Sequence, residues 1–292
     1  MSISVQALAS GSNGNCFLIS NKTDALLIDA GISRKRILES LKKINVPKEN
    51  IKGVLVTHTH SDHISGLPVL ANYIDAPVIT TSPSISELYR LSSRDDSYRK
   101  IANNAVCIRQ NKILEVGPFK VITVKAKHDS PGAVGFRVHY KVENTPGITV
   151  SLLTDTGKLD EHQLWQLSRS DLILLESNYD KNLLENSRRP LRLKHRIREN
   201  HLSNKRTYSI LKNLLSFQSS KRIKGVMLGH FSEECNSLDI ISSFVKRWEK
   251  RNETPFKGWE WFLAPRYGPS DYISITPEDL KINKEFAGKI EF

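Results

Sequence analysis

The sequence predicts an α/β protein folded as a four-layer αββα sandwich, and three observations lead to this prediction. Short apolar runs with strand character alternate with helical runs along the 292 residues. The runs form two β-rich halves, each with helices that can cover one face of its sheet. No Gly/Ser linker, low-complexity tract or fixed-period repeat separates the halves. We therefore expect a single domain over residues 1–292, in which the two sheets bury their inner faces against each other.

Apolar periodicity and turn residues place the expected elements. Strands are expected at residues 3–8, 16–20, 25–28, 54–56, 106–108, 119–125, 134–140, 148–153, 172–175, 225–228, 261–263 and 272–275. Helices are expected at residues 33–44, 64–74, 84–91, 160–167, 203–217 and 237–250. Ser82 and Pro83 are typical of an N-cap and a first helical position, and they precede the third of these helices.

Composition predicts a cytoplasmic protein that does not bind membranes. No apolar run approaches the roughly 20 residues that a membrane-spanning helix needs. The first residues lack the basic and apolar regions of a secretory signal. The three cysteines (Cys16, Cys107 and Cys235) are scattered and form no C-x-x-C pair, which argues against disulfides and thiolate metal sites. None of these features indicates an oligomeric state.

Basic residues are concentrated in one segment. Residues 181–224 contain 13 Lys and Arg against 2 Asp and Glu, a net charge of +11, whereas the rest of the chain has 30 against 29. A basic run is often no more than a solvated helical face. An excess of this size also attracts polyanions, because phosphates that bind to it release their counterions.

The stretch THTHSDH at residues 57–63 is the strongest chemical signal. It places His58, His60, Asp62 and His63 in one short loop behind an apolar strand. Neutral imidazole and carboxylate groups suit zinc and similar divalent metals. A single catalytic zinc needs only about three protein ligands, so four in one loop suggest two metals.

Two metals require further ligands, and suitable residues follow other predicted strands. His128 follows the strand at residues 119–125, Asp155 follows the one at 148–153, and His230 follows the one at 225–228. Sites on α/β scaffolds are commonly built where strands give way to loops. We therefore expect these three residues to join the histidine loop.

With Asp29 in the stretch LLIDAG, these residues resemble the motifs of the metallo-β-lactamase fold hydrolases over nearly the whole chain. The resemblance implies that Asp29 braces the histidine loop. It also implies two divalent ions, Zn²⁺ or Mn²⁺. One would be held by His58, His60 and His128, the other by Asp62, His63 and His230, with Asp155 bridging them.

Three further stretches, LASGSNGNCFLI, LLESNYD and LKHRIRENHLSN, look like those of the YycJ/WalJ branch, whose characterised members are implicated in DNA exonuclease activity. The resemblance implies hydrolysis of a phosphodiester by a hydroxide that bridges the two metals. His201 of HLSN occupies the place of the histidine that protonates the leaving oxygen in phosphodiesterase members, so it is the expected general acid. Asp62 is expected to orient the nucleophile as well as to bind metal.

Ser10, Ser12 and Asn15 lie in the turn between the first two strands. Their side chains could hydrogen-bond a phosphate or the metal ligands, or they could serve only to shape the turn.

The basic segment surrounds His201 and favours a polyanionic substrate over a neutral lactone or β-lactam. Substrate phosphates would contact Arg188, Arg189, Arg192, Lys194, Arg196 and Arg198. We therefore expect a nucleic-acid partner, with DNA preferred and RNA possible. Three alternatives stay open: a phosphodiesterase for small or cyclic nucleotides, a ribonuclease, and a non-catalytic nucleic-acid-binding protein.

Overall fold

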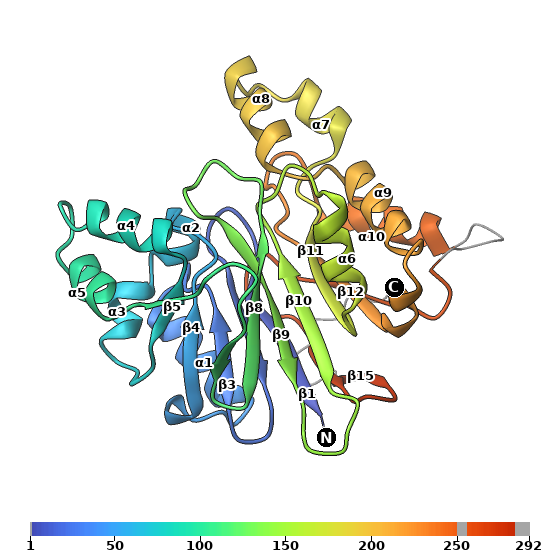
Figure 1. Ribbon diagram of the computed structural model, residues 1–292. Helices are drawn as coiled ribbons and strands as arrows, with labels where there is room; N and C mark the ends of the chain where they lie inside the picture. Colours follow the sequence, from blue (N-terminus) through green and yellow to red (C-terminus); the bar gives the residue numbers. More distant parts are fainter. Residues whose placement is uncertain (1, 250–255, 284–292) are drawn as a thin grey trace.

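Two β-sheets form the centre of the protein, for which a computed structural model describes residues 2–249 and 256–283 (Figure 1). The first sheet contains β1 (Ile3–Ala9), β2 (Cys16–Ser20), β3 (Ala25–Ile28), β4 (Ile51–Leu55), β5 (Val78–Thr80), β6 (Val106–Cys107), β14 (Tyr272–Ile275) and β15 (Leu280–Asn283). The second contains β7 (Leu114–Val116), β8 (Phe119–Lys125), β9 (Val134–Tyr140), β10 (Ile148–Leu153), β11 (Leu172–Glu176), β12 (Gly225–Gly229) and β13 (Glu260–Leu263). The strand orders are β15-β14-β1-β2-β3-β4-β5-β6 and β13-β12-β11-β10-β9-β8-β7.

Helices cover the outer side of each sheet (Figure 1). The first sheet is covered by α1 (Arg34–Lys43), α3 (Leu67–Ala71), α4 (Ser82–Leu91) and α5 (Ser97–Asn104), and the second by α6 (Glu161–Ser168), α9 (Asn204–Leu214) and α10 (Leu238–Glu249). Three more helices, α2 (Ser61–Ile64), α7 (Lys181–Asn186) and α8 (Leu191–Asn200), lie near one edge of the sheets, with α7 and α8 projecting beyond it. The predicted αββα sandwich is confirmed. In the described ranges, no helix combines the length and apolarity that crossing a membrane requires.

The apolar core has the three layers that this arrangement requires. Phe17, Phe119 and Phe136 lie between the two sheets and are at most 1% exposed. Two outer clusters fill the spaces between each sheet and its helices. Alternation along the strands produces the layering, since Phe119 and Val121 point inward while Lys120 between them is exposed. Burying each aromatic ring contributes about 1.5–3 kcal/mol relative to exposure.

Strand direction brings distant residues to one edge of the sandwich. Strands β3 to β6 are parallel, and so are β10 to β13. Strand β8 runs in the same direction as β10, because each is antiparallel to β9 between them. Loops that follow β8, β10, β11 and β12 therefore emerge at the same edge of the second sheet. The histidine loop of the first sheet lies at this edge too, because the Val134 amide donates a hydrogen bond to the Thr57 carbonyl at 3.0 Å.

The predicted helix at residues 64–74 is confirmed only for residues 67–71, and its bounds are wrong. The chain forms two short helices there, α2 and α3, which are separated by Ser65 and Gly66. Gly66 lies so close to the first sheet that a Cβ atom would come within 1.9 Å of the Ile32 carbonyl oxygen. This close approach to the turn after β3 interrupts the helix and fixes the histidine loop against that turn.

Other differences from the prediction are smaller. Helix α4 starts at Ser82, with Thr81 rather than Ser82 as its N-cap. Helices α5, α7 and α8 and the short strands β5, β7 and β15 were not predicted. Residue 250, the predicted end of the helix at 237–250, lies outside the described residues.

Candidate metal centre

Three residues of the expected site lie just beyond the end of a strand, where the backbone turns sharply, whereas Asp62 and His63 lie in α2. Asp29, Asp155 and His230 follow β3, β10 and β12, and their φ angles are 61°, 54° and 56°. The other described non-glycine residues with positive φ are all asparagines. Left-handed backbone costs an L-residue roughly 1–2 kcal/mol and persists where its surroundings impose it, often at functional sites. The turns direct these side chains towards the shared edge.

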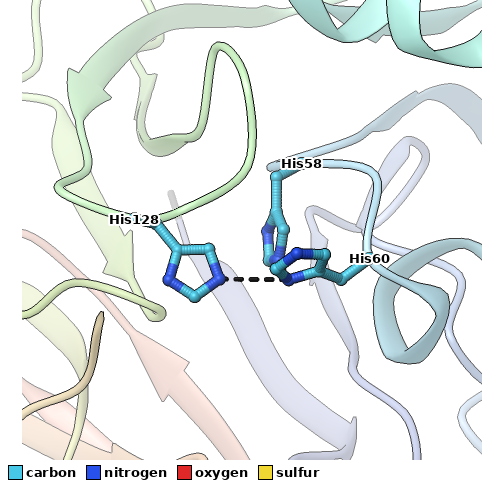
Figure 2. A group of neighbouring side chains, drawn as sticks. All are labelled: His58, His60 and His128. Atoms are coloured by element: carbon cyan, nitrogen blue, oxygen red, sulfur yellow. Dashed lines mark hydrogen bonds between the residues drawn. The ribbon is translucent and has the colours of Figure 1, made fainter. Parts of the chain in front are cut away.

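Three histidines from both sheets form the first ligand group (Figure 2). Nε2 of His58 and Nε2 of His128 each lie 3.1 Å from Nδ1 of His60. A single ring nitrogen cannot form two good hydrogen bonds of this kind, because it carries either one proton or one lone pair. Nitrogens bound tetrahedrally to zinc at about 2.0–2.1 Å would lie about 3.3–3.4 Å apart. The observed spacing therefore suits a shared cation.

A second group contains Asp62, His63 and His230, whose ligand atoms lie within 4.8 Å of one another. Asp62 Oδ2 is 3.4 Å from His63 Nε2 and 3.7 Å from His230 Nε2. Asp155 lies between the two groups, with its oxygens 3.2 Å from His63 Nε2 and 3.8 Å from His128 Nε2. The structure thus brings together all seven residues that were expected to bind metal.

Asp29 holds the histidine loop in place through contacts with Thr57 and His63. It is fully buried, and Oδ1 accepts hydrogen bonds from the Thr57 amide at 2.8 Å and the Thr57 hydroxyl at 3.0 Å. Its Oδ2 lies 2.7 Å from His63 Nδ1. A carboxylate behind a ligating histidine sets the ring orientation and leaves the other nitrogen facing the metal. Asp29 therefore has the surroundings expected of a bracing residue.

The buried charges of the centre fit a divalent cation. Burial lowers the pKa of His230, but Asp155, Asp62 and Glu176 outweigh this effect and raise it to about 10. Burial likewise raises the pKa of Asp155, yet His230 and His63 bring it well below its usual range. Asp155 Oδ2 and His230 Nε2 are buried without a hydrogen bond from the described residues. The carboxylates thus raise the pKa of the facing imidazole, and a metal ion at this position would supply the same positive charge directly.

His201 lies beside this centre and is paired with a buried carboxylate that the sequence did not single out. His201 is the C-cap of α8, and its Nδ1 lies 3.1 Å from Glu176 Oε2. The same oxygen is 3.2 Å from His230 Nδ1. Glu176 Oε1 accepts the Thr156 and Leu202 amides at 2.8 and 3.1 Å. Glu176 is the last residue of β11, whereas Asp155 and His230 lie one or two residues beyond their strands, and its place at a strand end was the signal that the sequence offered.

Side chains of the turn between β1 and β2 form hydrogen bonds with residues of the centre. The Ser10 hydroxyl accepts the His230 amide at 2.8 Å, and the Asn15 side-chain amide lies 3.1 Å from His63 Nε2 and 3.3 Å from Asp62 Oδ2. Ser10 and Asn15 are fully buried. Ser12 differs, because its exposed side chain lines the cavity of about 220 Å³ that His60, Asp62, His128, Asp155, His201 and His230 also line.

The six basic residues expected to bind nucleic acid do not form one free surface. Lys194 was assigned wrongly: it is buried, and its ammonium donates to the Glu185 carbonyl at 2.6 Å. The other five are at least partly exposed. Three of these are paired with carboxylates: Arg189 with Glu234 at 2.9 Å, Arg196 with Asp129 at 2.5 Å and Arg198 with Glu185 at 2.6 Å. Arg189 and Arg196 line the cavity beside the metal cluster.

Comparison with known proteins identifies the class. The profile of the "Metallo-beta-lactamase superfamily" matches residues 9–157, about half of the chain, and the chain belongs to this superfamily. The recognition of a metallo-β-lactamase fold hydrolase is confirmed.

Among its relatives, "Exodeoxyribonuclease WalJ" of Streptococcus pneumoniae serotype 2 is 31% identical over 238 residues, 80% of this chain and 83% of that protein. "Exodeoxyribonuclease YycJ" of Bacillus anthracis is 27% identical over 249 residues, 85% and 89% of the two chains. The structure is also similar to the crystal structure of the metallo-beta-lactamase fold protein YhfI from Bacillus subtilis, with a TM-score of 0.63 and 16% sequence identity. The match covers 92% of this chain and 98% of that chain, and it supports the fold alone.

Proposed function

We propose that the protein is a metal-dependent phosphodiester hydrolase that acts on nucleic acid, as a DNA exonuclease. The observation that carries this proposal is the pair formed by His201 and Glu176, which lies beside the two ligand groups at the same cavity. Phosphodiester hydrolysis expels an alkoxide, which is a poor leaving group, and the imidazole of His201 at this cavity is placed to give it a proton. Relatives named exodeoxyribonucleases support the choice.

The proposed cofactors are two divalent ions, Zn²⁺ or Mn²⁺, one for each ligand group. His58, His60 and His128 would hold one, Asp62, His63 and His230 the other, and Asp155 would contact both. When bound, such ions polarise a phosphoryl oxygen and lower the pKa of water near it.

The chain's own residues then supply orientation and the proton. Glu176 accepts from Nδ1 of His201, which leaves Nε2 to carry a proton to the leaving oxygen. The Asp62 carboxylate lies at the cavity and can orient the attacking water. Arg189 and Arg196 at the cavity mouth can hold non-bridging oxygens of the diester. Hydrolysis joins the water oxygen to phosphorus, breaks the bond to the leaving oxygen and transfers the proton of His201 to that oxygen. The proton that the water loses replaces, over one turnover, the one that His201 gave up.

The test is a digestion of end-labelled single- and double-stranded DNA and RNA by the purified protein with Zn²⁺, Mn²⁺ or Mg²⁺. We expect stepwise shortening of DNA, loss of turnover and metal in Asp155→Ala, and loss of turnover with metal retained in His201→Ala. Full turnover by metal-loaded His201→Ala would remove that residue from the mechanism. Binding without product, under every metal, would instead support the non-catalytic alternative.

A second candidate, a phosphodiesterase for small or cyclic nucleotides, is favoured by the extent to which the basic residues are already paired. Replacing Arg188, Arg189 and Arg192 together with uncharged residues distinguishes the nuclease from the phosphodiesterase for small substrates. A nuclease should show a higher KM for DNA and a shallower salt dependence, by about one unit of slope for each phosphate that the variant no longer neutralises. An enzyme for small diesters should show neither change.

A further inference from the structure

A second cavity adjoins the metal cluster on the side away from His201. It has a volume of about 400 Å³ and lies between the histidine loop, the α4–α5 helix pair and the loop after His128. His60 and Asp129 line both this cavity and the one that contains the cluster, whereas His201 and α8 line only the latter. We call it the Arg94 pocket, after one of its lining residues, which include Ile64, Arg90, Leu91, Arg94, Tyr98 and Pro131.

The polar groups of the Arg94 pocket are set up to receive an anion. Both acidic residues of its lining are paired: Glu87 with Arg90, which also lines the pocket, at 2.5 Å, and Asp129 with Arg196, which does not, at 2.5 Å. The carboxylates next to Arg94 in the chain are also engaged, since Asp95 accepts the Ser97 amide and Asp96 pairs with Arg99.

Two donors in the pocket therefore remain available. Among the described residues, none pairs with the Arg94 guanidinium or hydrogen-bonds the Tyr98 hydroxyl. Arg90 is held in place by Glu87, which occupies its Nε and one terminal nitrogen and leaves the other terminal nitrogen free. The Arg94 guanidinium, the free terminal nitrogen of Arg90 and the Tyr98 phenol are thus the donors of the pocket. Both arginines are exposed, and the charge of Arg90 balances that of Glu87.

The size and the remaining walls suit one nucleotide. The cavity at the metal cluster measures about 220 Å³, below the roughly 300–1,000 Å³ of pockets that enclose a small organic ligand, whereas the Arg94 pocket falls within that range. Leu91, Pro131 and the ring of Tyr98 offer apolar surface for a sugar and a base, whereas Ile64 is buried behind them. A substrate with its phosphate at the metals must therefore place its nucleosides outside the smaller cavity.

We propose that the Arg94 pocket is a nucleotide subsite, which holds the half of the diester that keeps the phosphate after cleavage. The inference rests on the proposed phosphodiesterase function. Because His201 protonates the leaving oxygen from the α8 side, the leaving half of the substrate lies on that side. The half that retains phosphorus then extends past His60 towards Arg94 and Tyr98, and the released or exposed terminus is a nucleoside monophosphate.

The test measures binding of deoxyadenosine monophosphate (5′ and 3′ isomers separately), deoxyribose 5-phosphate and inorganic phosphate by calorimetry to the metal-loaded protein. We expect a deoxyadenosine monophosphate to bind more tightly than either ligand without a base. Arg94→Ala should weaken this binding by about 10–100-fold, the loss of one charge-assisted hydrogen bond, and Tyr98→Phe by less. Arg99→Ala, an exposed arginine on the same helix pair but outside the pocket, is the matched control and should bind normally.

Hydrolysis of bis(p-nitrophenyl) phosphate separates this inference from the proposed function. Turnover of this small diester by the wild-type protein and by Arg99→Ala, together with nucleotide binding that is weakened in Arg94→Ala alone, supports both the proposed function and the subsite. Two results would overturn the subsite alone, provided that the small diester is turned over. In one, the nucleotide binds no more tightly than inorganic phosphate; in the other, it binds equally well to Arg94→Ala and to the wild-type protein. Absence of turnover in the wild-type protein overturns the proposed function, whatever the calorimetry shows.

Discussion

At the scale of single residues, the centre depends on carboxylates that orient imidazoles. Asp29 holds His63, and Glu176 holds both His201 and His230. The spacing of His58, His60, Asp62 and His63 in one loop could be read directly from the sequence. Glu176 could not, because one glutamate at the end of an apolar run is equally typical of a strand that ends in solvent. Its role depends on burial and on two partners that are distant in the chain.

Glu176→Gln tests this orientation with little change of shape. Oε1 of the glutamine can still accept the Thr156 and Leu202 amides, but the new amide group cannot accept from His201 and His230 as Oε2 does. We expect turnover to fall by about 10–100-fold, as is common when the partner of a site histidine is lost. Steady-state kinetics measure the effect, and Glu185→Gln is the control. Wild-type turnover in Glu176→Gln would show that the pair has no role.

Metal affinity should rise with pH. In the metal-free protein the pKa of His230 is raised to about 10, so its ring is protonated at neutral pH and must lose that proton to bind a metal. The pKa values of Asp62 and Asp155 are lowered, so both stay ionised and add no opposing trend. Between pH 8 and pH 6 the affinity should fall about tenfold per unit for each proton displaced. Calorimetry in buffers of different ionisation enthalpy measures how many protons are released when the metal binds. A metal affinity that does not depend on pH would contradict this prediction.

At the scale of elements, the direction of the strands assembles the centre. The parallel strands β10, β11 and β12 deliver Asp155, Glu176 and His230 to one edge, and β8 delivers His128. Apolar periodicity predicted most of these strands. It could not predict α7 and α8, because that segment is dominated by charged residues and has few apolar positions. It also missed the break at Gly66, which is caused by contact with Ile32 rather than by local preference.

Gly66→Ala should damage both the fold and the centre. The added Cβ would lie 1.9 Å from the Ile32 carbonyl oxygen, so the histidine loop and the turn after β3 must separate. Overpacking of this kind costs about 1–3 kcal/mol. Urea unfolding measures the loss, and Asn72→Ala, an exposed change at the end of α3, should stay within about 0.5 kcal/mol of wild type. Equal stability of the two variants would show that the loop has room to move.

At the scale of the whole molecule, the alternation of strands and helices was enough to predict the sandwich. Both sheets present an apolar face, and burying the two faces against each other leaves only the outer faces to be covered by helices. That residues 1–292 form one domain, and that the protein is cytoplasmic, stay predictions. The arrangement of basic side chains could not be predicted from their number, because pairing depends on carboxylates that the fold brings near them.

Removing metal should loosen the centre but leave the sandwich folded. The core between the sheets contains Phe17, Phe119 and Phe136 and no metal ligand. We expect chelated protein to keep its far-ultraviolet circular dichroism and to unfold at a lower temperature. The unfolding temperature should fall because a metal ion present at one hundred times its Kd stabilises the folded protein by about 2.7 kcal/mol, and chelation removes this contribution. Loss of secondary structure on chelation, with no recovery when metal is restored, would contradict this view.

The central claim is that ligands from separate strand ends hold metal at one edge of the sandwich. Anomalous diffraction from crystals grown with Zn²⁺ or Mn²⁺ tests it most directly. The account predicts one peak among His58, His60 and His128 and a second among Asp62, His63 and His230, with Asp155 within bonding distance of both. Peaks elsewhere on the protein, or none at this edge despite bound metal, would contradict it.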